Sequence, residues 1–150
     1  MEMLIASALF VVVLAVVLPF FPLGERSWET EAAKVELQQH GRIAMEEIQH
    51  ELLYAYQVSC DPAKGIITYY KKISGNLKRY RIYLWGQQLL LDLPEGTAVP
   101  LASYVDSFSL APAGKLQAGQ AVIVLLTFSL AEEQITFRSS IMPKNLAVEV

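Results

Sequence analysis

The sequence predicts an α+β protein in which a long N-terminal helix packs on a C-terminal antiparallel β-sheet. Three observations support this fold class. The chain begins with an uncharged apolar run, continues with apolar residues at three- and four-residue steps, and ends in short alternating segments separated by turn residues. Its 150 residues are enough for one such domain.

The apolar run extends over Met3–Leu23, has no charge and contains Ser7 as its one polar side chain. A helix of this length can cross a hydrocarbon core of about 30 Å. The run is too long for a secretory signal peptide, and it lacks the polar face of a core helix. We therefore predict a transmembrane helix over residues 1–24 and an extracytoplasmic α+β domain over residues 25–150. The protein would be a single-pass component of the cell membrane with a cytoplasmic N-terminus.

Two residues distinguish this run from an ordinary membrane anchor. Glu2 is either solvated at the helix N-terminus, where the macrodipole favours it, or held at the hydrocarbon edge for a cationic partner. Pro19 removes a backbone hydrogen bond and clashes with the preceding turn, at a cost of about 3 kcal/mol. With Pro22 and Gly24 following, we expect the helix to kink or melt at this point.

The segment from Glu2 to Phe10, with Pro19 in register, resembles the start of the type IV pilin and type II secretion pseudopilin family. Ile141–Asn145 is similar to the end of its PilW/GspJ-like minor subunits. The resemblance implies a pilin-like fold and a minor pilin or pseudopilin. Such a subunit assembles through its hydrophobic N-terminal helix into a type IV pilus, competence or type II secretion filament, which it initiates or caps. Glu2 and Pro19 are then the filament-assembly residues.

The same resemblance implies the partners. These are other pilin or pseudopilin subunits, the inner assembly platform and membrane lipid. Met1 stands where the family carries a cleaved leader, so we expect the true start to lie upstream and prepilin peptidase to be a further partner. One alternative is a single-pass, membrane-anchored extracytoplasmic binding domain with no filament role, which leaves the register of Glu2 and Pro19 unexplained. A second alternative, a membrane-anchored enzyme, explains less, because the sequence contains no recognisable site.

The amphipathic stretch predicts a helix from about Ser27 to Ser59, ended by the turn chemistry of Cys60-Asp61-Pro62. Gly41 should weaken its middle by about 1 kcal/mol relative to Ala. Its expected buried stripe consists of Trp28, Ala32, Val35, Met45, Ile48, Leu52 and Ala55. The expected solvated face includes Glu46, Glu47 and Glu51.

Six segments after this helix predict strands of an antiparallel sheet. The segments are Ile66–Lys72, Leu77–Trp85, Leu89–Leu93, Tyr104–Leu110, Ala121–Leu130 and Ile135–Ile141. The almost wholly apolar segment from Ala121 to Leu130 indicates a central strand.

The sequence contains no motif of an enzyme or of a metal or cofactor site. His40 and His50 are ten residues apart on the predicted helix, which turns them about 280° from each other and prevents a shared metal. Cys60 is the single cysteine and excludes a zinc cluster or an internal disulfide. We therefore predict no catalytic, cofactor-binding or metal-binding residues.

The densest positive charge lies between Lys71 and Arg81, within a chain of net charge −3. Its members, the candidate surface for DNA or for an anionic cell-wall or lipid polymer, are Lys71, Lys72, Lys78, Arg79 and Arg81. The alternative is a solvated hairpin tip whose charges protect a strand edge.

Overall fold

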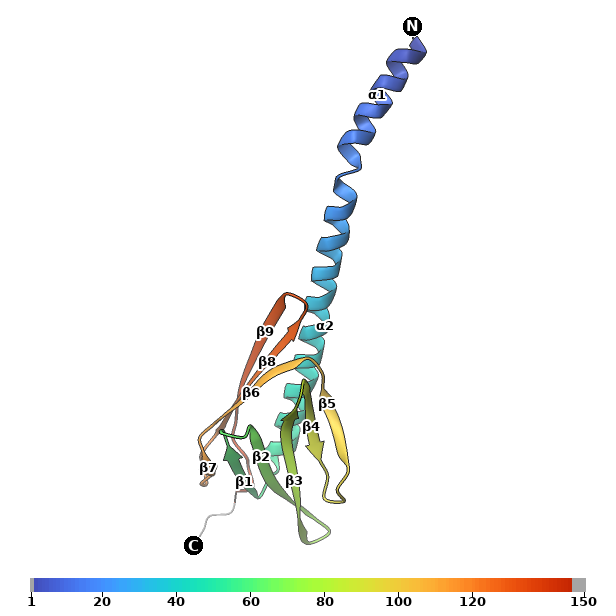
Figure 1. Cartoon of the computed structure of the whole chain (residues 1–150). Helices are drawn as coiled ribbons and strands as arrows, with labels where there is room; N and C mark the ends of the chain where they lie inside the picture. The colour runs from blue at the N-terminus through green and yellow to red at the C-terminus, as the bar shows by residue number, and fades with distance from the viewer. Residues whose placement is uncertain (1, 147–150) are drawn as a thin grey trace.

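The structure, a computed structural model, describes residues 2–146, except the side chains of residues 2, 4, 21–27 and 29. Two helices, α1 (Glu2–Val17) and α2 (Phe20–Leu53), precede all the strands (Figure 1). The strands are β1 (Gln57–Asp61), β2 (Ile66–Ile73), β3 (Asn76–Trp85), β4 (Gln88–Asp92), β5 (Ala98–Ala102), β6 (Val105–Ala111), β7 (Gly114–Lys115), β8 (Val122–Leu130) and β9 (Glu133–Ile141).

The helical segment is interrupted at Leu18 and Pro19, as the sequence predicts. The Leu18 amide still donates to the Leu14 carbonyl at 2.9 Å, whereas Pro19 has no amide hydrogen to continue the pattern. Pro22 lies in the first turn of α2, where a missing donor costs little. The predicted domain boundary at residue 24 falls inside α2.

Within the described residues, no helix has both the length and the apolar character needed to cross a membrane. The predicted transmembrane helix over residues 1–24, and with it the single-pass location in the cell membrane, is therefore wrong. The physical reason is the break at Pro19. It limits α1 to 16 residues, or about 24 Å at 1.5 Å per residue, against a hydrocarbon core of about 30 Å.

The strands form two antiparallel sheets. The six-stranded sheet has the order β5-β4-β3-β2-β1-β7, and the three-stranded sheet has the order β6-β8-β9. Within the second sheet β8 is central, as its apolar sequence predicts. The chain passes from one sheet to the other between Ala102 and Val105, where Tyr104 has a positive φ of 64°.

The α+β class is confirmed, but the predicted pilin-like architecture, one long N-terminal helix on one sheet, is wrong. The helix is divided in two, and α1 extends away from both sheets (Figure 1). The strands are also divided between two sheets, because the turn at Tyr104 redirects the chain before β6. The strands that the sequence missed are β1, β5 and β7.

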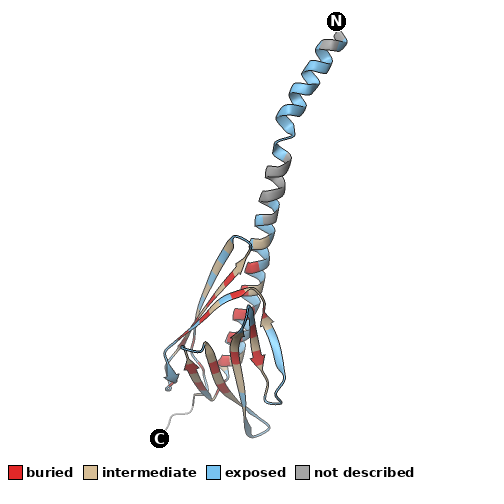
Figure 2. Ribbon diagram, in the orientation of Figure 1, coloured by how far each residue is buried: buried red, intermediate tan, exposed pale blue. Residues whose placement is uncertain are grey.

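The core lies between the C-terminal part of α2 and the two sheets (Figure 2). Among the described side chains of α2, the buried stripe begins at Leu37 and continues through Ala44, Met45, Ile48 and Leu52. The sheets contribute alternate residues such as Ile67, Tyr69 and Ile82 from one sheet and Val124, Leu126 and Phe128 from the other. The predicted stripe is therefore correct in its second half and wrong in its first, since Trp28 and Val35 are 79% and 60% exposed.

Gly41 permits a close approach between α2 and β9. It is buried, and a Cβ at this position would lie closer than 3.0 Å to three ring atoms of Phe137 in β9. The Phe137 ring in turn packs edge-to-face on Phe128, with centroids 5.7 Å apart. The glycine that weakens the isolated helix thus allows this contact.

The described C-terminal segment closes the end of α2. The Lys144 amide donates to the Leu53 carbonyl at 2.8 Å, and the Asn145 side-chain amide donates to the Tyr54 carbonyl at 3.5 Å. These donors satisfy carbonyls that have no partner inside the helix. The segment that resembles a pilin terminus therefore has a structural role here.

We expect Gly41→Ala to lower the free energy of unfolding by about 1–2 kcal/mol, because overpacking against Phe137 exceeds the gain in helix propensity. Urea unfolding followed by circular dichroism measures the change. Gln39→Ala, an exposed position on the same helix, is the control and should change stability by less than about 0.5 kcal/mol. A Gly41→Ala protein more stable than the parent contradicts the packing account.

Candidate assembly surface and polar cluster

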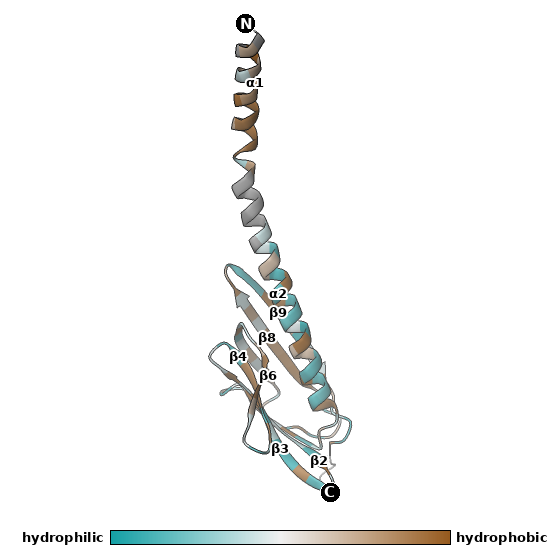
Figure 3. Ribbon diagram, turned by 90° about the vertical axis from the view of Figure 1, so that its right-hand side faces the viewer, coloured by the Kyte–Doolittle hydropathy of each residue, from teal (hydrophilic) through white to brown (hydrophobic). Residues whose placement is uncertain are grey.

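Among the described elements, α1 carries the most exposed large apolar side chains, and Figure 3 shows that the helix is hydrophobic along most of its length. Every α1 side chain that the structure describes is exposed. The exposed fractions of four successive residues, Phe10, Val11, Val12 and Val13, are 64%, 62%, 59% and 57%. Four successive helical positions point in four directions, so the helix is apolar and exposed on all sides.

The two predicted assembly residues lie at the ends of α1. Glu2 is its first residue, and its side chain lies outside the described part of the structure. Pro19 stands between α1 and α2 and has helical dihedral angles, with φ −67° and ψ −19°. The role of either residue in assembly stays a prediction.

The five predicted anion-binding residues do not form one site. Lys71 pairs with Glu51 at 2.7 Å, and Arg81 pairs with Asp92 at 2.5 Å. A hollow of about 180 Å³ lies beside Arg81 and Asp92 and is also lined by Arg79. Since Asp92 neutralises Arg81, an anion there would meet one net positive charge. Lys72 and Lys78 lie nearer the turn of the β2–β3 hairpin.

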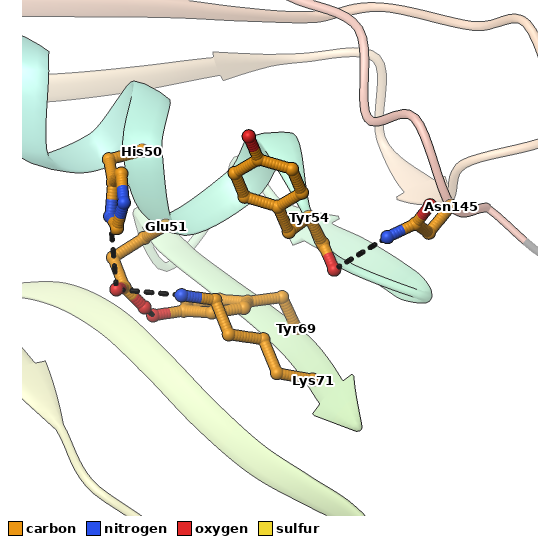
Figure 4. Close-up of polar contacts among 6 residues, drawn as sticks. All are labelled: His50, Glu51, Tyr54, Tyr69, Lys71 and Asn145. Atoms are coloured by element: carbon orange, nitrogen blue, oxygen red, sulfur yellow. Dashed lines mark hydrogen bonds and ion pairs between the residues drawn. The ribbon is translucent and has the colours of Figure 1, made fainter. Parts of the chain in front are cut away.

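Glu51 is the centre of a polar cluster at the end of α2 (Figure 4). Its carboxylate accepts a short hydrogen bond from the Tyr69 hydroxyl and the ion pair from Lys71. His50 Nδ1 lies 3.9 Å from the same carboxylate. The side chains of Glu51 and Lys71 are only 13% and 18% exposed, so the pair is shielded from water. The prediction that Glu51 lies on the solvated face is wrong, because the Glu51 side chain lies at the edge of the buried stripe, next to Leu52.

The surroundings fix the protonation state of Tyr69. Burial raises the pKa of its hydroxyl, and the hydrogen bond to the Glu51 carboxylate raises it further. A neutral hydroxyl is the form that can donate to this carboxylate. Tyr69 also stacks on Tyr80 with ring centroids 5.3 Å apart, which places β3 over the cluster.

Glu47, His50 and Glu51 could in principle hold a metal ion, because one ligand atom from each lies within 4.8 Å of the others. Glu51 is already engaged by an ammonium group and a hydroxyl. A divalent ion would have to displace Lys71, and the remaining two ligands are exposed. The arrangement therefore fits a structural ion pair better than a metal site.

Cys60 is buried, with 3% of its surface exposed, and burial raises its pKa from 9.0 to about 11. A neutral buried thiol is a poor nucleophile. The prediction that the chain is no enzyme remains untested.

Comparison with protein-family models, with curated proteins and with solved structures found no match for this chain.

We expect Glu51→Ala to lower the free energy of unfolding by about 2–4 kcal/mol, because it leaves a shielded ammonium and a buried hydroxyl without an acceptor. The matched control is Glu46→Ala on the same helix, since Glu46 pairs with Arg42 at 3.0 Å but both side chains are well exposed. That control should cost about 0.5 kcal/mol or less in urea unfolding. Equal losses in the two variants would show that the Glu51 cluster adds nothing to stability.

We expect Cys60 to make stability fall as pH rises from 9 to 11. In this window the unfolded thiol loses its proton, whereas the folded thiol, with its pKa raised to about 11, keeps it. The two-unit difference corresponds to at most about 3 kcal/mol. The measurement is the difference in unfolding free energy between the parent and Cys60→Ala, in which the contribution of Tyr69 cancels. A difference independent of pH contradicts the assignment.

Proposed function

We propose that this chain is a minor subunit of a type IV pilin or pseudopilin filament and that it assembles through α1. The observation that carries the proposal is an apolar helix exposed on every side beside a folded domain with its own core. The same apolar contacts would hold together a filament of a pilus, of a competence system or of a secretion system.

The distribution of apolar residues on α1 favours a filament over a simple dimer. An amphipathic helix buries one stripe against one neighbour, whereas a helix with no polar face needs apolar contacts all round. Seven of its most apolar positions, Leu9, Phe10, Val11, Val12, Val13, Val16 and Val17, are between 44% and 64% exposed. A bundle of α1 helices from several subunits would cover all of these surfaces at once.

The break at Pro19 supports the same arrangement. It ends α1 as a separate helix, so the angle between α1 and α2 can adjust while α1 packs among its neighbours. The partners required are other subunits with a similar apolar helix and an assembly machinery that delivers them. Glu2 would set the axial register of the bundle, because an unpaired carboxylate among apolar helices is costly.

The test compares assembly of the full-length chain with that of two variants. Val12→Asp places a charge in the middle of the apolar surface, and we expect it to abolish sedimentable assemblies. Glu2→Ala keeps the apolar surface and removes only the carboxylate. We expect it to lose incorporation into an ordered filament, as seen by electron microscopy, while retaining association.

Glu46→Ala, far from α1 on the exposed face of α2, is the control and should assemble like the parent. Circular dichroism must show that all variants keep the folded domain. Assembly of Val12→Asp at the parent level would rule out the proposal, and a binding module without filament role would then be the better description.

A further inference from the structure

The β2–β3 hairpin ends in a two-stranded ribbon that projects from its sheet. Strand β1 pairs with β2 no further than Tyr70, and β4 pairs with β3 only from Arg81 onward. The eight residues Lys71–Lys78 therefore pair only with each other, and Arg79 and Tyr80 pair only with Tyr70 and Tyr69 of β2. The turn holds them in fixed register, because Ser74 and Gly75 both have positive φ, as a two-residue hairpin turn requires.

One face of this ribbon carries an apolar residue between two bases. Lys72 lies opposite Leu77, and Arg79 is the next residue of β3 on the same face. All three are exposed, Leu77 by 52%. Neither Lys72 nor Arg79 has an ion-pair partner among the described residues. We call Lys72, Leu77 and Arg79 the basic ribbon face.

The part of α2 that precedes Leu37 carries acidic residues beside exposed apolar ones, whereas the ribbon carries basic residues. Trp28 and Val35 are seven residues apart, so they lie on one side of the helix, and they are 79% and 60% exposed. Glu31 and Glu36 are exposed and flank this apolar stripe at angles of about 60–80° on either side of Trp28. This side of α2 faces away from the core, because Leu37, on the opposite side, is buried. We call Trp28, Glu31, Val35 and Glu36 the acidic helix face.

The two faces lie toward opposite ends of an elongated molecule. The β2–β3 turn is at the end far from the N-terminus, and the upper part of α2 leads from the sheets toward α1 (Figures 1 and 3). Two complementary surfaces at opposite ends cannot meet within one chain. When they meet between copies, the contact is head-to-tail, and it generates an open fibre where the rotation between successive copies does not close a ring.

We propose that the basic ribbon face of one copy docks on the acidic helix face of a second copy. Leu77 packs between Trp28 and Val35 of that copy, while Lys72 and Arg79 pair with Glu31 and Glu36. The charges orient the two copies, and the apolar contact excludes water between them. The inference rests on the proposed function, because it gives the filament a second contact between subunits, separate from α1.

The experiment uses two full-length chains in the Cys60→Ala background, one with Leu77→Cys and one with Val35→Cys. Under mild oxidation, the mixture should give a disulfide-linked heterodimer, and a chain with both substitutions should give a ladder of multimers. Adding Lys72→Glu and Arg79→Glu to the first chain should reduce the heterodimer about tenfold. Adding Glu31→Lys and Glu36→Lys to the second should restore it.

The inference is overturned if the mixture gives no heterodimer, or if charge reversal leaves the heterodimer unchanged. A duplex or single-stranded oligonucleotide is a further probe. If it binds the parent but not the charge-reversed chain, while cross-linking persists in the reversed chain, the ribbon is assigned to nucleic acid. That result also overturns the inference. The test is separate from that of α1. If Val12→Asp loses the fibres but still cross-links, both proposals are supported. If Val12→Asp keeps both the fibres and the cross-linking, only the α1 proposal is refuted.

Discussion

The packing of the C-terminal part of α2 against both sheets is the interaction on which the rest of the structure depends. The two sheets have no common strand pairing, so the buried stripe of α2 holds them together. Gly41 lets α2 approach β9 so closely that the Phe137 ring occupies the space that a side chain at position 41 would fill. At the other end of the contact, Glu51 is joined to β2 through Tyr69 and Lys71. Between these points the helix is fixed in position and direction.

This fixed helix also determines what is left outside the core. Among the described side chains of the two helices, the first buried one is Leu37, and the apolar surface of α1 remains uncovered. An uncovered apolar surface of this extent marks a site of interaction. Pro19 limits α1 to 16 residues, and under the proposed assembly the α1 helices of neighbouring subunits cover this surface.

The sequence was informative where a pattern is local. Alternation with a period of two residues identified β3, β4 and β9, and Pro19 identified the helix break. The β-branched and aromatic content identified β2, and the apolar run identified β8. The missed strands have physical reasons. The alternation in β1 follows directly on the amphipathic helix, whose predicted range, to about Ser59, included part of it. Pro100 makes β5 a poor strand by propensity, but proline is tolerated at the edge of a sheet, where β5 lies. The role of Gly41 depends on Phe137, and that of Glu51 on Tyr69 and Lys71, so no local pattern could have identified either residue.

The central claim is that neighbouring subunits cover α1 on every side, and spin labels test it most directly. A label is attached in turn to cysteine substitutions at Phe10, Val11, Val12 and Val13, which point in four directions around the helix. In the assembled protein, electron paramagnetic resonance should show all four labels protected from a water-soluble relaxation agent. Protection at one or two adjacent positions only, or at none, would contradict the claim, because it would leave most of α1 facing solvent.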